Sequence, residues 1–130
     1  MKKAKILIID DDEEICEEMS GILQDEGYLV DKAFDGLKGN EILQKDNYDL
    51  LLLDLKLPGL SGFDILKSVK DKALKTRVLV VTGRPMRGLM RNIVTKEEES
   101  KDEILKLADG YINKPFDVEV LLDIIRELVG

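Results

Sequence analysis

Aspartates follow two short apolar segments of the chain, and they are the residues best suited to chemistry. Ile6–Ile9 leads directly into three aspartates that begin at Asp10, and Leu50–Leu53 leads into Asp54, ahead of the turn Pro58-Gly59. An apolar run that ends at an acid and a turn is typical of a buried strand that delivers the acid to a loop. Two such strands in one sheet indicate a small acidic pocket. The pocket would need a cation, and it would place one aspartate to act as a nucleophile.

The rest of the sequence alternates strand and helix patterns, which predicts an α/β fold with a parallel sheet. The expected strands are Lys5–Ile9, Tyr28–Ala33, Tyr48–Leu53, Arg77–Val81 and Gly110–Asn113. The third strand shows no alternation of apolar and polar residues, as expected where helices cover both faces of a sheet. The expected helices are one capped by Asp12 that stops at Gly27, one from the Asp35-Gly36 turn to about Lys45, Gly62–Asp71, one near Lys101–Ala108, and Val118–Val129. Gly39-Asn40 in the second helix predicts a short or irregular element, because both are poor interior helix residues.

Ligands of open parallel sheets bind beyond the carboxyl ends of the strands, so the residues expected at this edge form a candidate site. They are Asp10, Asp11, Asp54, Thr82 and Lys114. Three carboxylates close together cannot all stay ionised without a counter-charge, and Mg²⁺ prefers oxygen ligands. A metal and a lysine would together bind a phosphoryl group, which a carboxylate could attack to form an aspartyl phosphate. The hydroxyl of Thr82 could donate a hydrogen bond to a phosphoryl oxygen.

Composition narrows the class of protein and its partners. The 130 residues suit one domain, with a net charge of −7 that argues against nucleic acid as the main partner. No apolar stretch approaches the length of a membrane span, and the N-terminal segment does not fit a signal peptide. A single cysteine, Cys16, suits a reducing compartment, and the absence of histidine removes His-based catalysis and His metal ligands. We therefore expect a cytoplasmic protein with no nucleic-acid partner and no membrane partner.

Four stretches carry a resemblance to a known family: Ile6–Glu13, Asp49–Gly62, Val78–Gly83 and Gly110–Phe116. With them, the chain resembles the response regulator receiver domain of two-component signalling over essentially its whole length. The resemblance implies a flavodoxin-like (βα)5 doubly wound sandwich with a five-stranded parallel sheet in the order 2-1-3-4-5. It also implies that residues 1–130 form one receiver domain, and we expect no output domain.

The resemblance implies a role for each residue of the candidate site. Asp54 resembles the phosphoacceptor, and it would also be a ligand of the metal. Asp11 resembles a direct Mg²⁺ ligand, Asp10 would bind the metal through water, and the backbone carbonyl of Lys56 would also coordinate it. Lys114 would contact the phosphoryl group, and its bond to Pro115 is expected to be cis, a geometry that is accessible before proline.

Other positions resemble the family's switch and tuning residues. Thr82 would move onto the phosphoryl group, and Tyr111 would then turn inward into the space that Thr82 leaves. Lys56 and Arg84 occupy the positions that border the phosphoryl group and tune its lifetime. Two long cations there predict slow self-dephosphorylation.

The implied function is a phosphoacceptor switch of a two-component or phosphorelay system. A sensor histidine kinase or phosphotransfer protein would donate the phosphoryl group, and the phosphorylated form would alter binding to an unknown downstream protein. The chain would catalyse only its own phosphorylation and dephosphorylation, as a monomer or weak dimer.

The connection between the fourth and fifth strands is about ten residues longer than is usual in the family. Within the inserted segment Arg84–Ser100, Arg84–Val94 is rich in Arg and Met. The patterns Thr95–Glu98 and Ser100–Glu103 fit capping boxes and predict an added helical turn or short helix. The segment is either a harmless surface insertion or an altered signalling face for a protein partner.

Simpler interpretations of single residues also remain open. The three aspartates could cap a helix, Lys114 could be a surface lysine, and Tyr111 could be a fixed tyrosine at the sheet edge. Two other functions are an aspartate-nucleophile phosphatase and an inactive receiver that acts only as an interaction module. The first usually needs an acid two residues after the nucleophile, where this chain has Lys56, and the intact set of five residues argues against the second.

Overall fold

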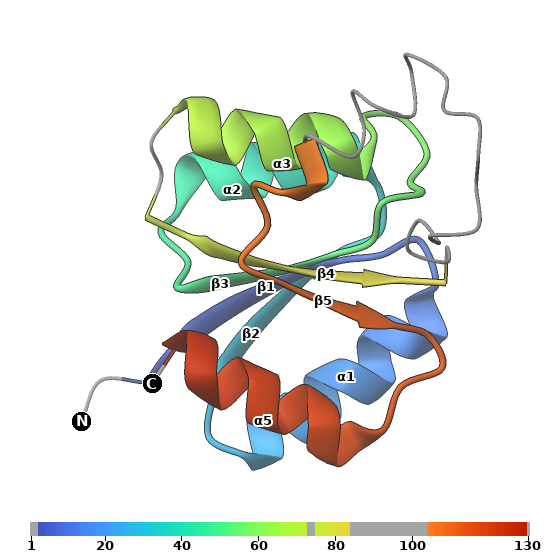
Figure 1. Ribbon diagram of the computed structural model, residues 1–130, viewed down its shortest axis with the longest axis vertical. Helices are drawn as coiled ribbons and strands as arrows, with labels where there is room; N and C mark the ends of the chain where they lie inside the picture. The colour runs from blue at the N-terminus through green and yellow to red at the C-terminus, as the bar shows by residue number, and fades with distance from the viewer. Residues whose placement is uncertain (1–2, 73–74, 84–103, 130) are drawn as a thin grey trace.

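Short apolar segments form the strands of a parallel sheet. The computed structural model describes residues 3–72, 75–83 and 104–129, with the backbone alone at Thr82. Within these residues the strands are β1 (Lys5–Ile9), β2 (Leu29–Ala33), β3 (Leu50–Leu53), β4 (Arg77–Thr82) and β5 (Gly110–Asn113). All neighbouring strands are parallel, in the order β2-β1-β3-β4-β5 (Figure 1). The predicted sheet and its strand order are confirmed.

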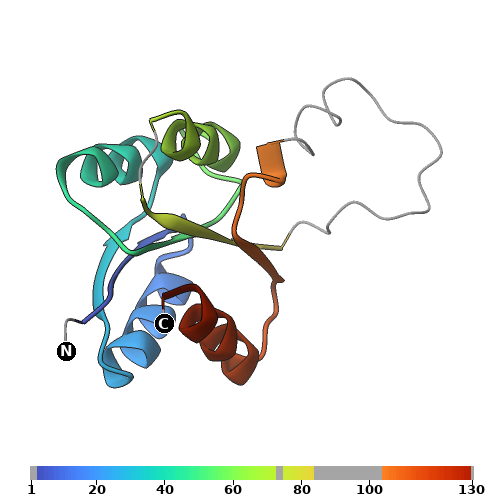
Figure 2. The ribbon, with the colours of Figure 1, turned by 60° about the vertical axis from the view of Figure 1, so that its left-hand side comes forward.

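Helices cover both faces of this sheet. Those within the described residues are α1 (Glu13–Asp25), α2 (Gly36–Lys45), α3 (Gly62–Asp71) and α5 (Val118–Val129). Helices α1 and α5 lie on one face, and α2 and α3 lie on the other (Figures 1 and 2). No helix in this part of the chain combines the length and the apolar character needed to cross a bilayer.

Alternate residues of each strand enter two separate hydrophobic clusters. In β1, Leu7 and Ile9 join the cluster under α2 and α3, whereas Ile6 and Ile8 join the cluster under α1 and α5. All four side chains are fully buried. Each such side chain contributes about 1.5–3 kcal/mol relative to an exposed one, so burial on both faces holds β1 and β3 in the centre of the sheet.

The ends of the elements differ from the sequence-based boundaries by one or two residues. Strand β2 begins at Leu29 rather than Tyr28, β3 begins at Leu50 rather than Tyr48, and β4 extends to Thr82. The predicted cap of the first helix is confirmed, because the carboxylate of Asp12 accepts a hydrogen bond from the Ile15 amide at 3.2 Å.

The predicted helix near Lys101–Ala108 lies partly outside the described residues. Ile104 and Leu105 are helical, and the Leu107 amide donates to the Ile104 carbonyl at 2.9 Å as the chain turns toward β5. The helix ends at Leu105, short of the predicted Ala108, and the side chains of Ile104, Leu105 and Ala108 pack against the cluster under α2 and α3. The Arg84–Ser100 segment lies outside the described residues, so its added turn stays a prediction.

The expected irregularity of the second helix is not observed, and the reason is a close contact with β1. Helix α2 continues through Gly39 and Asn40 without a break. A Cβ atom at Gly39 would lie 2.5 Å from Cδ1 and 2.8 Å from Cγ1 of Ile9, so only glycine lets the helix approach the strand this closely. Tertiary packing outweighs the low helix propensity of glycine here.

This contact predicts that two glycine-to-alanine substitutions have opposite effects on stability. Gly39→Ala should lower the free energy of unfolding by about 1–3 kcal/mol, the usual cost of overpacking. Gly21→Ala, at a position in α1 with no atom within 4 Å of the added Cβ, should raise it by up to about 1 kcal/mol because alanine favours the helix. Urea unfolding followed by circular dichroism measures both. Adding Ile9→Val to Gly39→Ala should recover part of the loss, and stabilisation by both single substitutions would contradict the packing argument.

Candidate active site

The carboxyl ends of β1 and β3 bring three aspartates together. Ile9 and Leu53 are register partners in these neighbouring strands, and the Asp54 amide donates to the Ile9 carbonyl at 3.0 Å, one residue beyond the strand. One carboxylate oxygen from each of Asp10, Asp11 and Asp54 lies within 4.8 Å of the other two. The acidic pocket that the sequence predicted is therefore present at this edge of the sheet.

Asp10 lies deepest, and hydrogen bonds within the protein occupy both of its carboxylate oxygens. Its Oδ1 accepts from the Asp12 amide at 3.0 Å, and its Oδ2 accepts from Nζ of Lys114 at 2.6 Å. The buried thiol of Cys16 donates to the Asp10 carbonyl at 3.3 Å. Burial raises the pKa of this thiol to about 12, so Cys16 stays neutral behind the acidic pocket.

Asp54 is almost as buried, with 7% of its surface exposed, but its carboxylate is less firmly held. Oδ1 accepts from the Lys56 amide at 3.2 Å, and Oδ2 lies 3.6 Å from Nζ of Lys114. Burial raises the pKa of Asp54, and the charges of Asp10 and Asp11 raise it further, against the opposing effects of the Lys56 amide and the Lys114 charge. The ionised form of Asp54 is therefore costly in the folded protein when no cation is present.

Lys114 enters the pocket from the end of β5, the edge strand next to β4. It follows β5, whose last residue, Asn113, is the register partner of Thr82. Burial lowers the pKa of Lys114, but the hydrogen bond to Asp10 and the charges of Asp10 and Asp54 outweigh it, and the pKa is raised overall. Lys114 therefore remains an ammonium ion. The predicted cis bond between Lys114 and Pro115 is confirmed.

The structure gives less information on the predicted switch and tuning residues. Thr82 ends β4 at the same edge of the sheet, although its side chain lies outside the described structure. Tyr111 pairs with Val80 across the sheet, is 37% exposed, and donates its hydroxyl hydrogen to the carbonyl of Leu105. Lys56 is exposed, and Arg84 lies outside the described residues.

The charges and ligand types of the pocket fit a hard divalent cation. Lys114 offsets one of the three negative charges and leaves two for a metal ion. All three side chains offer carboxylate oxygens, the ligands that Mg²⁺ prefers, and Asp11 is exposed to solvent. Both oxygens of Asp10 accept short hydrogen bonds, whereas Oδ2 of Asp54 lies 3.6 Å from Lys114 and Asp11 is exposed, so Asp11 and Asp54 are the carboxylates best placed for direct coordination.

Two features of the site were not deduced from the sequence. The first is the ion pair between Lys114 and Asp10, because spacing alone cannot say which carboxylate a distant lysine will choose. The second is the close packing of the loop after Asp54, where the Gly62 amide donates to the Leu55 carbonyl at 3.1 Å. A Cβ at Gly62 would lie 2.3 Å from the carbonyl oxygen of Asp54. The glycine itself was the available signal for this contact.

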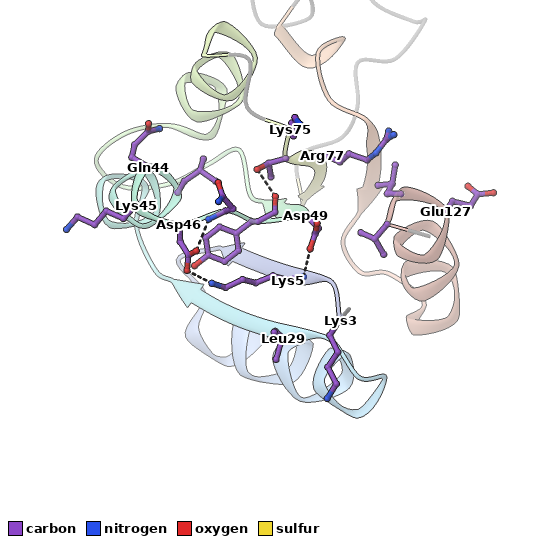
Figure 3. A pocket seen from close by; sticks show the side chains of 16 residues that line it. Lys3, Lys5, Leu29, Gln44, Lys45, Asp46, Asp49, Lys75, Arg77 and Glu127 are labelled. Atoms are coloured by element: carbon purple, nitrogen blue, oxygen red, sulfur yellow. Dashed lines mark hydrogen bonds and ion pairs between the residues drawn. The ribbon is translucent and has the colours of Figure 1, made fainter. Parts of the chain in front are cut away.

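The opposite edge of the sheet holds a hollow whose central charges pair with one another (Figure 3). Nζ of Lys5 forms an ion pair with Asp46 and lies 4.9 Å from the centre of the Tyr48 ring, while the Lys5 amide donates to Asp49 at 2.8 Å. The side chains of Lys45 and Glu127 project away from the hollow in Figure 3. These contacts connect the starts of β1 and β3. We therefore interpret the hollow as structural and place the candidate active site at the carboxyl edge of the sheet.

Comparison with known proteins agrees with this geometry. The family model described as "Response regulator receiver domain" matches residues 6–126. The transcriptional regulatory protein DltR of Streptococcus agalactiae is 36% identical over 125 residues, which cover 94% of this chain and 50% of DltR. Response regulator ArlR of Staphylococcus saprophyticus is 34% identical over 128 residues, which cover 96% of this chain and 52% of ArlR. The chain thus spans about half the length of these relatives.

Solved structures match over nearly their whole length. Chemotaxis protein CheY4 of Vibrio cholerae superposes with a TM-score of 0.78 at 29% identity, covering 98% of this chain and 99% of CheY4. Response regulator TrrA of Thermotoga maritima, in complex with Mg²⁺ and BeF, superposes with a TM-score of 0.79 at 28% identity, covering 96% of this chain and 98% of TrrA.

The crowded carboxylates predict that Asp54→Asn stabilises the metal-free protein. In EDTA at neutral pH the substitution should raise the free energy of unfolding by about 1 kcal/mol, the usual size of a single-residue effect. Because folding raises the pKa of Asp54, its ionised form is destabilising above that pKa, and this cost disappears as the pH falls and Asp54 takes up a proton in both states. The advantage of the variant should therefore shrink toward acid pH.

Urea unfolding across a pH series measures this difference, with the exposed Asp71→Asn as a matched control that should change stability by no more than about 0.5 kcal/mol. Added Mg²⁺ should stabilise the wild type more than the Asp54→Asn variant. A variant less stable than the wild type at neutral pH in EDTA would contradict the argument that burial and repulsion make the Asp54 charge costly.

Proposed function

The chain belongs to the response regulator receiver domain family, and from this premise we propose that Asp54 accepts a phosphoryl group from a histidine kinase or a phosphotransfer protein. Phosphorylation of an aspartate is the general mechanism of the two-component response regulators to which it is related. The observation that carries the proposal is the meeting of Asp10, Asp11, Asp54 and Lys114 at one edge of the sheet.

In the proposed reaction a carboxylate oxygen of Asp54 attacks the phosphorus of a phosphohistidine. An O–P bond forms while the N–P bond of the donor breaks, and the electron pair of that bond returns to the imidazole, which leaves. The Lys56 amide, at 3.2 Å from Oδ1, orients the nucleophile. The ammonium group of Lys114, at 3.6 Å from Oδ2, is close enough to offset charge that develops on the phosphoryl oxygens.

The residues of the pocket would also hold Mg²⁺. We assign Asp11, Asp54 and the Lys56 carbonyl as direct ligands and Asp10 as a ligand through water, since both Asp10 oxygens are engaged. When bound, the ion offsets negative charge on the phosphoryl oxygens. The complex of TrrA with Mg²⁺ and BeF supports the assignment by analogy.

The signalling step would then depend on Thr82 and Tyr111. We propose that Thr82 moves toward the phosphoryl group and that Tyr111 turns inward, which would break its hydrogen bond to the Leu105 carbonyl. Contacts made only in the phosphorylated state would shift the balance between two conformations. We propose a protein as the downstream target. DltR is named as a transcriptional regulator, so the absence of a nucleic-acid partner stays a prediction.

The first test of this function is the loss of phosphorylation in Asp54→Asn. With acetyl phosphate and Mg²⁺, the wild type should gain one phosphoryl group by intact-protein mass spectrometry, and Asp54→Asn should gain none because an amide cannot replace the attacking carboxylate. Asp71→Asn, on the exposed end of α3, should be labelled like the wild type. Equal metal-dependent labelling of Asp54→Asn and the wild type would refute the assignment.

The second test concerns the lifetime of the phosphoryl group. Lys56 is exposed and lies two residues after Asp54, where a long cationic side chain can shield the phosphorus from water. Lys56→Ala should therefore shorten the lifetime several-fold in a dephosphorylation time course, while Lys67→Ala, on the exposed face of α3, should leave it unchanged. An unchanged lifetime in Lys56→Ala would count against the shielding role.

A further inference from the structure

The loop from Leu55 to Ser61 connects Asp54 to α3 and is clamped by the start of α2. We propose that Gly36 is a positioning residue: its bare backbone sets the position of this loop, and through the loop the affinity of the site for Mg²⁺. The inference rests on the proposed function for the identity of the metal. Gly36 itself touches neither the nucleophile nor the proposed ligands.

Gly36 contacts the loop at two points, and both contacts are with backbone atoms. Its amide donates to the Pro58 carbonyl at 3.2 Å. A Cβ atom at position 36 would lie 1.6 Å from the carbonyl oxygen of Leu60 and 2.6 Å from its carbonyl carbon. A side chain at this position cannot be accommodated by a rotamer change of a neighbour, so the loop backbone or the helix would have to move.

The helix itself does not require glycine at this position. Among the described residues a positive φ occurs at Gly27 and Gly59, and Gly36 is not one of them. Asp35 already caps the helix, because its carboxylate accepts from the Lys38 amide at 2.7 Å. Alanine favours a helix over glycine, so the only cost of Gly36→Ala that the structure shows is the collision with Leu60.

A displacement of Leu60 has a short route to the nucleophile. Gly62, two residues further on, is packed against the carbonyl oxygen of Asp54 and Cα of Leu55 so closely that a Cβ would lie 2.3 and 2.6 Å from them. The loop is therefore in close backbone contact with α2 at Leu60 and with the end of β3 at Gly62. Where the loop yields rather than the helix, the displacement at Leu60 is passed along the loop toward Asp54.

A displacement at position 36 would also reach Lys56, through the hydrogen bond between the Gly36 amide and the Pro58 carbonyl. Pro58, which Gly36 anchors, lies two residues after Lys56, whose amide holds Oδ1 of Asp54 at 3.2 Å. The Lys56 carbonyl is the proposed third metal ligand. Small displacements matter in such a site because Mg²⁺ requires nearly ideal octahedral geometry at short metal–oxygen distances.

The test compares Mg²⁺ binding of wild type and Gly36→Ala by isothermal titration calorimetry, without any phosphodonor. The dissociation constant should rise about tenfold in the variant, a factor that corresponds to about 1.4 kcal/mol of binding free energy. Phosphorylation by acetyl phosphate should slow at low Mg²⁺ and recover toward the wild-type rate as Mg²⁺ is raised.

Leu43→Ala is the matched control, because Leu43 is buried on the same helix, in the cluster under α2 and α3, but makes neither of the two backbone contacts of Gly36. This variant should lose stability and keep the wild-type Mg²⁺ affinity of its folded form. Equal affinities in Gly36→Ala and the wild type, or equal losses in Gly36→Ala and Leu43→Ala, would overturn the positioning role.

A measurement on the wild type keeps the proposal testable if Gly36→Ala does not fold. In a nuclear magnetic resonance titration with Mg²⁺, the Gly36 amide should shift together with the Lys56 amide, while the Gly39 amide should not; a silent Gly36 amide would overturn the proposal. Failure of the wild type to accept phosphate at Asp54 would instead refute the proposed function, because both Mg²⁺ measurements are made without phosphate.

Discussion

The site depends on the partial compensation of three carboxylates at the carboxyl edge of a parallel sheet. Asp10, Asp11 and Asp54 meet there, and Lys114 is the cation that the described structure places among them. One ammonium ion cannot balance three carboxylates, so the metal-free pocket carries excess negative charge in a poorly solvated place. Burial raises the pKa of Asp54, and the charges of Asp10 and Asp11 raise it further. The same imbalance would favour a bound cation, as the proposed function requires.

The sheet can hold this unfavourable arrangement because its stability comes from elsewhere. The fully buried apolar side chains of β1 and β3 lie directly behind the aspartates and pack on both faces. The strand register sets the positions of these apolar side chains. It also sets the positions of Asp10 and Asp54, because each follows its strand directly. Stability and reactivity are thus separated along the same segments: the strand supplies the burial, and the residue after it supplies the charge.

Much of this arrangement follows from the sequence, because parallel sheets align the carboxyl ends of their strands. Apolar runs that stop at acids predict β1, β3 and the acidic pocket. Side-chain partners are harder to deduce: that Lys114 lies closer to Asp10 than to Asp54, or that Tyr111 donates to the Leu105 carbonyl, depends on positions set by the whole fold. Gly39 shows the converse difficulty. Its low helix propensity predicted an irregular helix, whereas its contact with Ile9 explains why glycine stands in a regular one.

Lys114 lies closer to Asp10 than to Asp54, and under the proposed function this predicts how the lysine moves on phosphorylation. Its Nζ lies 2.6 Å from Asp10 and 3.6 Å from Asp54, so in the metal-free protein it mainly neutralises the deeper acid. A phosphoryl group carries nearly two negative charges at neutral pH and would draw the lysine outward. Asp10 is almost fully buried and would lose its principal counter-charge unless a metal ion lay nearby. Phosphorylation and metal occupancy are therefore coupled through one side chain: the cation that best stabilises the product is also the one that Asp10 needs when the site holds no metal.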